Sequence, residues 1–197
     1  MNKAVFLDRD GVINELVYNE NRNEYEPPFE KEDLKLIKGV TESLKKLSER
    51  KFKLFIVSNQ PDFAKGKTSL ENLKSVQDEL HKLFTAEGIE FTGYYYCYHH
   101  PEGIVRDYAG ECECRKPNPY FVNRAVKEYN IDINKSWFIG DRDTDINCGK
   151  SAGLKTILVK YGGSGLYRKD SEPDFMSGNL EEAVNIIMSE DPDSIRN

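Results

Sequence analysis

Short apolar runs alternate with amphipathic stretches along the chain, and several of the apolar runs end in polar residues. The apolar runs lie at residues 4–7, 52–57, 91–97, 136–139 and 156–159. Stretches with apolar side chains at helical spacing lie at residues 39–50, 70–87, 120–129 and 145–152, and a last one follows Asn179. Short apolar runs bounded by turn residues are typical of strands buried on both faces. The alternation predicts an α/β fold, in which a Rossmann-like, mostly parallel sheet has helices on both faces.

Local signals mark the ends of some of these elements. Residues 68–71 read Thr-Ser-Leu-Glu, a capping-box sequence that predicts a helix start, and residues 179–182 carry a similar signal. Three glycines at residues 162–165 predict a flexible loop. The helix predicted at residues 120–129 follows an Asn-Pro pair, which is typical of a helix start.

The length of 197 residues fits one domain with insertions. We therefore interpret residues 1–197 as a single domain. Residues 15–33 are polar and contain two adjacent prolines, so we expect a loop over the carboxyl end of the first strand, with a disordered insertion as the alternative. Residues 97–116 form a second insertion, and residues 190–197 are a polar, frayed tail.

Polar side chains follow three of the predicted strands. Asp8 and Asp10 come after the first strand, Ser58 and Asn59 after the second, and Asp141 and Asp145 after the fourth. Because the carboxyl ends of parallel strands open on one edge of a sheet, we expect these side chains to lie together where ligands bind. Carboxylates of this kind suit Mg²⁺, which binds a few carboxylates together with water and phosphate. Taken alone, Asp8 and Asp10 are equally consistent with a turn or a helix cap.

A basic pair adds a second kind of chemistry. Arg115 and Lys116 are adjacent in the sequence. Arginine binds phosphate through two parallel hydrogen bonds, and lysine supplies a point charge. Taken alone, such a pair is usually solvated surface. Combined with a carboxylate site for Mg²⁺, it indicates a phosphorylated substrate.

The overall charge is mildly acidic, with 28 Lys and Arg against 34 Asp and Glu and a net charge of −6. This balance argues against nucleic acid as the main partner, although a local cluster of cations can still bind an anionic metabolite. No apolar run approaches the ~20 residues of a membrane span, and no secretory signal is visible. We therefore expect a cytoplasmic protein without membrane association, and a monomer.

The cysteines suggest a second metal site. In a reducing compartment cysteines are more often metal ligands or free thiols than disulfides. Cys97, Cys112 and Cys114, with an imidazole from His99 or His100, match a tetrahedral Cys₃His zinc site. The C-x-H and C-x-C spacing differs from the commoner C-x₂-C pattern, and simple buried thiols are the alternative. Four protein ligands leave no open position, so this zinc would be structural.

The motifs together resemble those of the haloacid dehalogenase superfamily. Residues 8–11 (Asp-Arg-Asp-Gly), 58–59 (Ser-Asn), Lys116 and 140–145 (Gly-Asp, with Asp145) follow that family's order, from residue 1 to about 160. Ser-Asn-Gln and Arg-Lys-Pro are also similar to the small phosphatases that act on D,D-heptose 1,7-bisphosphate and histidinol phosphate. The resemblance implies the α/β fold of that superfamily with a small or absent cap and a zinc-binding loop insertion.

The resemblance also implies a role for each matching residue. Asp8 would be the nucleophile that forms an aspartyl-phosphate, and Asp10 would protonate the leaving alkoxide and then accept a proton from water. Asp145 would orient its neighbours. The other implied roles are Mg²⁺ binding by Asp8, the Asp10 backbone carbonyl and Asp141, phosphate binding by Ser58, Asn59 and Lys116, and substrate binding by Arg115 and Arg142.

The same phosphatases carry a C-x-H…C-x-C loop just before Arg-Lys-Pro. By this resemblance the structural Zn²⁺ is held by Cys97, His99, Cys112 and Cys114, and His100 is the alternative to His99. The zinc would position Arg115 and Lys116, which follow Cys114 directly.

The predicted function is that of a Mg²⁺-dependent phosphatase with a structural zinc. The leading substrate is D-glycero-D-manno-heptose 1,7-bisphosphate, and the nearest rival is histidinol phosphate. Polynucleotide 3′-phosphatase activity and a non-catalytic zinc-loop interaction module are alternatives of other classes. Residues 61–66 read Pro-Asp-Phe-Ala-Lys-Gly where the heptose enzymes typically carry Ser-Gly-Ile-Ala-Arg-Gly, so the sequence leaves the sugar open.

Overall fold

The computed structural model describes residues 1–191, so the predicted tail falls outside the description from residue 192 onward. Its centre is a six-stranded sheet in the order β5-β4-β1-β6-β7-β8, in which every pair of neighbouring strands is parallel. The strands are β1 (Ala4–Leu7), β4 (Lys53–Asn59), β5 (Gly93–Cys97), β6 (Trp137–Gly140), β7 (Lys155–Val159) and β8 (Phe175–Ser177). The predicted parallel α/β sheet is confirmed.

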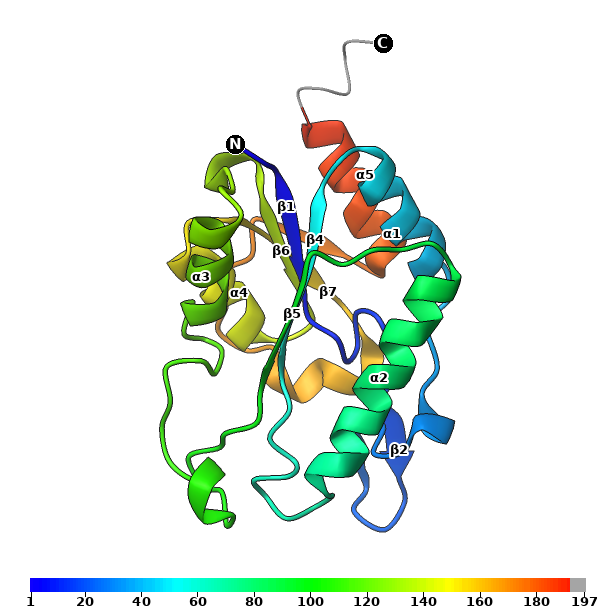
Figure 1. The fold of residues 1–197 in the computed structure, drawn as a ribbon, viewed down its shortest axis with the longest axis vertical. Coiled ribbons are helices and arrows are strands. Elements are labelled where there is room, and N and C mark those ends of the chain that lie inside the picture. Colours follow the sequence, from blue (N-terminus) through cyan, green and yellow to red (C-terminus); the bar gives the residue numbers. More distant parts are fainter. Residues whose placement is uncertain (192–197) are drawn as a thin grey trace.

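Helices cover both faces of the sheet (Figure 1). One face carries α1 (Val40–Glu49), α2 (Leu70–Ala86) and α5 (Leu180–Glu190), and the other carries α3 (Tyr120–Glu128) and α4 (Asp143–Ser151). The alternation of side chains along β1 explains this arrangement, because successive residues of a strand point to opposite faces. Val5 and Leu7 pack in the core beneath α1, α2 and α5, whereas Ala4 and Phe6 pack in the core beneath α3 and α4.

Side-chain caps set the starts of two helices. The Ser69 hydroxyl accepts a hydrogen bond of 3.0 Å from the Asn72 backbone N–H at the start of α2. The predicted capping box at residues 68–71 is therefore displaced, since the cap is Ser69 and not Thr68. At α5 the Asn179 side chain accepts a 2.9 Å hydrogen bond from the Glu182 backbone N–H, as the sequence predicted.

The insertion at residues 15–33 is ordered. It forms a hairpin of β2 (Val17–Asn19) and β3 (Glu24–Glu26), followed by the short 3-10 helix η1 (Lys31–Asp33). The Lys67 ammonium lies 2.8 Å from a Glu24 carboxylate oxygen and 2.6 Å from one of Glu26, which fastens the hairpin to the loop after β4. The disordered alternative is wrong, and the hairpin is a small cap beside the carboxyl edge of the sheet.

Two segments near the C-terminal end differ from the sequence prediction. Strand β8 was not predicted because three residues are too few to show a periodic pattern. The predicted flexible loop at residues 162–165 instead begins the 3-10 helix η4 (Gly162–Tyr167), in which Ser164 is buried. The other short 3-10 helices are η2 (Arg106–Tyr108) and η3 (Ile133–Lys135). Within residues 1–191, no helix has both the length and the apolar character that a membrane span requires.

Candidate active site

The carboxyl ends of β1, β4 and β6 meet at one edge of the sheet, beside a cavity of about 380 Å³. The cavity is lined in part by Asp8, Asp10, Asn59, Lys116, Arg142 and Asp145. The β2–β3 hairpin lines one side of it through Glu24, Tyr25 and Glu26. The structure thus brings together side chains from all three polar clusters that the sequence singled out.

Three buried carboxylates converge at this edge. Oxygen atoms of Asp8, Asp141 and Asp145 all lie within 4.8 Å of one another. Burial, together with the charges of Asp145 and Asp8, raises the pKa of Asp141 to about 8. The Oδ1 atom of Asp141 is also buried and has no hydrogen-bond partner among the described residues. Crowded carboxylates with a free acceptor fit a divalent cation of the Mg²⁺ type, which would relieve their repulsion.

Two small residues pack against Asp141. The Ser164 hydroxyl, from η4, donates a hydrogen bond to Asp141 Oδ2. Gly11 has a φ of 84°, and a side chain there would overlap the Asp141 carboxylate. The sequence analysis included Gly11 in its first motif but did not select Ser164 as a site residue. The glycines around Ser164 indicate a loop and give no sign of a contact with Asp141.

Lys116 connects two of the carboxylates. Its ammonium lies 2.9 Å from Asp8 Oδ1 and 2.7 Å from Asp145 Oδ1, and it donates a 2.6 Å hydrogen bond to the Val57 carbonyl. Burial alone would lower the pKa of Lys116, but Asp145 and Asp8 outweigh burial and raise it. Burial likewise opposes ionisation of Asp8, yet Lys116, Ser58 and Arg142 together hold the pKa of Asp8 below its usual value. The arrangement keeps Asp8 as a carboxylate, the form that a nucleophile needs.

Asp10 is held by three neighbours that the sequence analysis did not select. Its Oδ1 accepts hydrogen bonds from Arg9 (3.1 Å from Nε and 2.9 Å from Nη2) and from Asn14 Nδ2 (2.9 Å). Its Oδ2 accepts a 2.6 Å hydrogen bond from Gln60 Nε2. All three donors are fully buried. Arg9 and Gln60 lie inside the motif segments, and Asn14 lies just after the first of them. The sequence gives no other signal for these residues, since nothing local marks an arginine as buried.

The Asn59 side chain holds the backbone of Lys116. Its Nδ2 donates to the Lys116 carbonyl (3.1 Å), and its Oδ1 accepts from the Lys116 backbone N–H (3.0 Å). Asn59 was predicted to bind phosphate, and in this structure both ends of its amide are used on Lys116. Its side chain therefore fixes the place of Lys116 relative to β4.

Both predicted substrate-binding arginines line the cavity. Arg115 Nη1 donates a 3.1 Å hydrogen bond to the His99 carbonyl, and burial lowers the pKa of Arg115. The Arg142 guanidinium lies 4.3 Å from the centre of the Tyr167 ring. The two cations thus approach the cavity from the zinc-loop side and from the η4 side.

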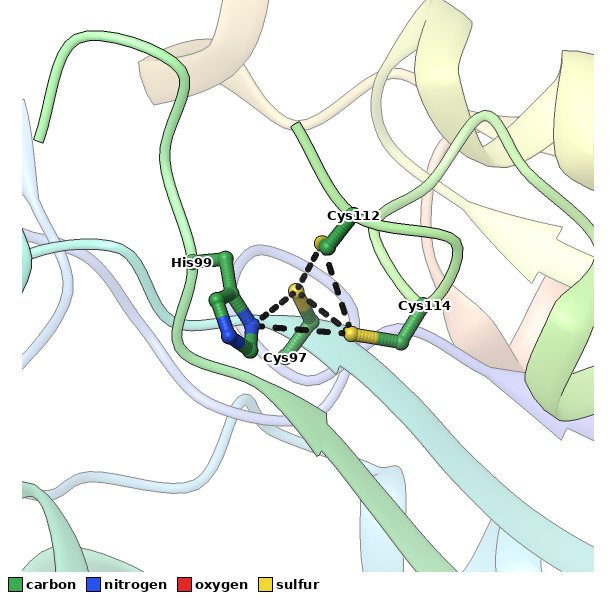
Figure 2. Close-up of side chains that lie close together, drawn as sticks. All are labelled: Cys97, His99, Cys112 and Cys114. Atoms are coloured by element: carbon green, nitrogen blue, oxygen red, sulfur yellow. Dashed lines mark hydrogen bonds between the residues drawn. The ribbon is translucent and has the colours of Figure 1, made fainter. Parts of the chain in front are cut away.

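The predicted zinc residues form one compact cluster (Figure 2). The sulfur atoms of the three cysteines lie 3.6, 3.3 and 3.4 Å apart. His99 Nδ1 lies 3.9 Å from Cys97 Sγ and 3.7 Å from Cys114 Sγ. A tetrahedral centre with zinc–sulfur bonds of about 2.3 Å places its sulfur atoms about 3.8 Å apart, so the donor set fits zinc. His100 lies outside this cluster and lines the cavity instead, where its Nδ1 accepts a hydrogen bond from the Glu102 backbone N–H.

The cysteine cluster adjoins the active-site cavity along the chain. Cys97 ends β5, and Cys114 directly precedes Arg115 and Lys116. The loop returns close to the sheet edge, where Asn118 Nδ2 donates a 3.2 Å hydrogen bond to the Cys112 carbonyl. The cluster therefore joins a sheet strand to the segment that carries both basic residues.

Comparison with known proteins assigns the chain to a family. A family model described as HAD-hydrolase-like matches residues 113–183. The chain is 36% identical over 163 residues to D-glycero-beta-D-manno-heptose-1,7-bisphosphate 7-phosphatase of Pasteurella multocida. The aligned residues cover 82% of this chain and 84% of that relative. It is 31% identical over 185 residues to the enzyme of the same name from Yersinia pestis, and the aligned residues cover 93% of this chain and 94% of that enzyme.

The fold and the site define a hydrolase of the haloacid dehalogenase type. With these identities and coverages, the chain belongs to the family of the D-glycero-D-manno-heptose 1,7-bisphosphate 7-phosphatases. The recognition made from the sequence motifs is confirmed.

Solved structures share the fold. The D,D-heptose 1,7-bisphosphate phosphatase from B. bronchiseptica, complexed with magnesium and phosphate, superposes with a TM-score of 0.78 at 21% identity, over 95% of this chain and 99% of that one. A putative HAD-like phosphatase from Mesorhizobium loti gives a TM-score of 0.74 at 24% identity, over 94% and 87%.

Proposed function

We propose that this protein removes the 7-phosphate of D-glycero-D-manno-heptose 1,7-bisphosphate through an aspartyl-phosphate on Asp8. The observation that carries the proposal is the contact of Lys116 with both Asp8 and Asp145 on the wall of the cavity. An ionised carboxylate beside a fixed ammonium can attack phosphorus while the charge on the phosphoryl oxygens is neutralised. The names of the relatives support the choice of substrate.

In the first step the Asp8 carboxylate attacks the phosphorus and the ester P–O bond breaks. Asp10 gives its proton to the departing sugar alkoxide. In the second step Asp10 takes a proton from water, whose oxygen attacks the phosphorus and releases Asp8 and inorganic phosphate. Ser58 and Lys116 bind the transferred phosphoryl group through both steps.

Mg²⁺ is the cation that the carboxylates fit. The Asp8 and Asp141 carboxylates and the Asp10 backbone carbonyl would hold it, while Asp145 accepts hydrogen bonds from the backbone N–H groups of Asp141 and Arg142 and orients that segment. When bound, the ion neutralises charge between the nucleophile and the phosphate.

The cavity suits a small anionic sugar. Its volume of about 380 Å³ lies within the range of metabolite sites. Lys65, Arg115 and Arg142 bring cations to its wall, in a chain whose net charge is −6. We propose that the chain acts as a cytoplasmic monomer, because every residue invoked belongs to one chain and the thiols of the cysteine cluster need a reducing compartment.

The test is release of phosphate from a panel of esters with Mg²⁺ present. The panel contains the heptose bisphosphate, histidinol phosphate and a 3′-phosphorylated oligonucleotide. We expect the highest kcat/KM for the heptose bisphosphate, with the 1-phosphate retained in the product. A higher kcat/KM for either of the other two would reject this substrate, and no hydrolysis of any ester would reject the phosphatase proposal.

We also propose that Cys97, His99, Cys112 and Cys114 hold a structural Zn²⁺. We expect a Cys112→Ser variant to lose its zinc and to have kcat lowered by about 10-fold or more, because Arg115 and Lys116 lose a fixed anchor. Metal analysis and phosphate release, both with Mg²⁺ present, measure the effect.

The matched control for the zinc experiment is Cys148→Ser. Cys148 is a buried residue of α4, outside the cysteine cluster, and its thiol donates to the Asn118 carbonyl. This variant is expected to keep its zinc. A protein shown to be free of zinc that retains full activity with Mg²⁺ would refute the positioning role.

A further inference from the structure

Gln60 is a fully buried residue that has no role in the chemistry described above. It follows Asn59 at the end of β4. Its Nε2 donates to Asp10 Oδ2 (2.6 Å) and to Ser58 Oγ (3.0 Å), and its Oε1 accepts from Arg9 Nη2 (2.8 Å). One amide therefore contacts both the proton-transferring carboxylate and a phosphate-binding hydroxyl.

The orientation of this amide is determined by Arg9. A guanidinium can only donate hydrogen bonds, so the amide atom that faces Arg9 must be the carbonyl oxygen. The NH₂ group must then face Asp10 and Ser58. Arg9 is itself fixed, because its Nε and Nη2 both donate to Asp10 Oδ1. Arg9, Gln60 and Asp10 thus form a closed, buried ring of hydrogen bonds.

Gln60 constrains two side chains of the active site, Ser58 and Asp10. The hydroxyl oxygen of Ser58 accepts from Gln60, so its own proton is directed elsewhere, and a hydrogen bond from Ser58 contributes to the lowered pKa of Asp8. The Asp10 carboxylate has its Oδ2 held by Gln60, while its Oδ1 is held by Arg9 and Asn14. Among the described residues, Gln60 makes the one hydrogen bond to Oδ2, so its loss leaves that oxygen unrestrained.

We propose that Gln60 is a positioning residue that aims the Asp10 carboxyl group at the oxygen of the leaving group. The proposal rests on the phosphatase function above and extends it. It predicts that the effect of losing Gln60 depends on how much the leaving group needs a proton. An alkyl ester needs protonation as the P–O bond breaks, whereas a p-nitrophenyl ester leaves as a stable anion.

The first test is a Gln60→Met variant, which keeps the side-chain length and removes both hydrogen-bonding ends. Rapid-quench experiments measure the rate of aspartyl-phosphate formation from the heptose bisphosphate and from p-nitrophenyl phosphate. We expect the alkyl rate to fall by at least about 30-fold and the aryl rate to change by less than about 3-fold, since general acid catalysis contributes about 10²- to 10⁴-fold. Equal losses with the two esters, or no loss with either, would overturn the proposal.

The second test is Gln60→Glu, which keeps the shape and an acceptor for Arg9. Two carboxylates in this contact share a proton, so the acid form of the pair persists to higher pH. We expect the alkaline limb of the alkyl-ester rate to move up by at least about one pH unit, and the aryl-ester profile to stay in place. An unmoved alkaline limb would overturn the proposal, and this variant decides the matter if Gln60→Met does not fold.

The matched control is Gln77→Ala. Gln77 is also a buried glutamine, but it lies on α2 and its side chain accepts from the Tyr98 hydroxyl. The Gln77→Ala variant is expected to have lower thermal stability, and any change in its rates should be the same for the alkyl and the aryl ester.

If the wild type hydrolyses p-nitrophenyl phosphate and another sugar phosphate but not the heptose bisphosphate, the substrate assignment fails. That sugar phosphate then serves as the alkyl ester in the tests of Gln60. A wild type that hydrolyses neither kind of ester overturns both proposals.

Discussion

An Asp8→Asn variant is expected to lose at least about 10³-fold in kcat with every phosphate ester while staying folded. The neutral amide cannot attack phosphorus as the carboxylate does, and Lys116 beside it lowers the pKa of Asp8 so that the wild-type group is ionised at neutral pH. Phosphate release gives the rate. Acid-quenched wild-type protein should carry a phosphoryl group on the peptide that contains Asp8, and the variant should carry none.

The control for this experiment is Asp78→Asn, on the exposed side of α2. It makes the same chemical change far from the cavity and should leave kcat within about 2-fold, as expected of a surface substitution. Turnover retained in a preparation of Asp8→Asn shown by mass spectrometry to be free of aspartate would rule out Asp8 as the nucleophile.

The second large effect is expected for Lys116→Met. Methionine fills most of the volume of the lysine but leaves Asp8 and Asp145 without their buried cation. Removing one partner of a buried ion pair typically costs about 3–5 kcal/mol of unfolding free energy. We also expect kcat to fall by about 10²-fold or more, because a fixed donor to the phosphoryl group is lost. Urea unfolding without added Mg²⁺ and phosphate release with Mg²⁺ measure the two effects.

The loss of stability should depend on pH in a defined direction. The pKa of Lys116 is raised above its ordinary value of 10.5, so its contribution is complete at neutral pH and fades only as the pH rises through the raised value. The pKa of Asp8 is lowered below its ordinary value of 3.8, so its contribution is present above that value and fades as the pH falls below it. The difference between wild type and Lys116→Met should therefore be full at pH 7 and shrink in acid.

Lys82→Met is the matched control for the lysine experiment. The Lys82 side chain is 75% exposed and lies 3.8 Å from Glu79, so its pair is weak. We expect a change within about 0.5 kcal/mol. A loss for Lys116→Met no greater than this would show that the buried contacts of Lys116 do not stabilise the fold.

The chain order of strands and helices was accessible from the sequence because it depends on local periodicity. The apolar run at residues 4–7 and the polar cluster after it place Asp8 at the carboxyl end of a buried strand without any knowledge of the rest. Strand β8 shows the limit of this reasoning. It is three residues long, and it pairs with β7 beside Thr156, whose N–H and hydroxyl both bind the Asp174 carboxylate.

The insertion at residues 15–33 shows a second limit. Its composition was equally consistent with a loop and with disorder, because hairpin formation there depends on partners outside the segment. Lys67, more than 40 residues further along, holds Glu24 and Glu26. Such long-range ion pairs have no local signature.

By itself the sequence determined the class of chemistry, since acidic pairs after apolar strands and an Arg-Lys pair after cysteines are local features. Only the tertiary structure decided how these groups are held. Ser164 reaches Asp141 across 23 residues, and Gln60 reaches Asp10 across 50, through contacts that exist only once the sheet has formed. His99 and His100 were adjacent alternatives in the sequence, and the fold turns one to the sulfur atoms and the other to the cavity. Direction and burial are properties of packing, which is why no local pattern could specify them.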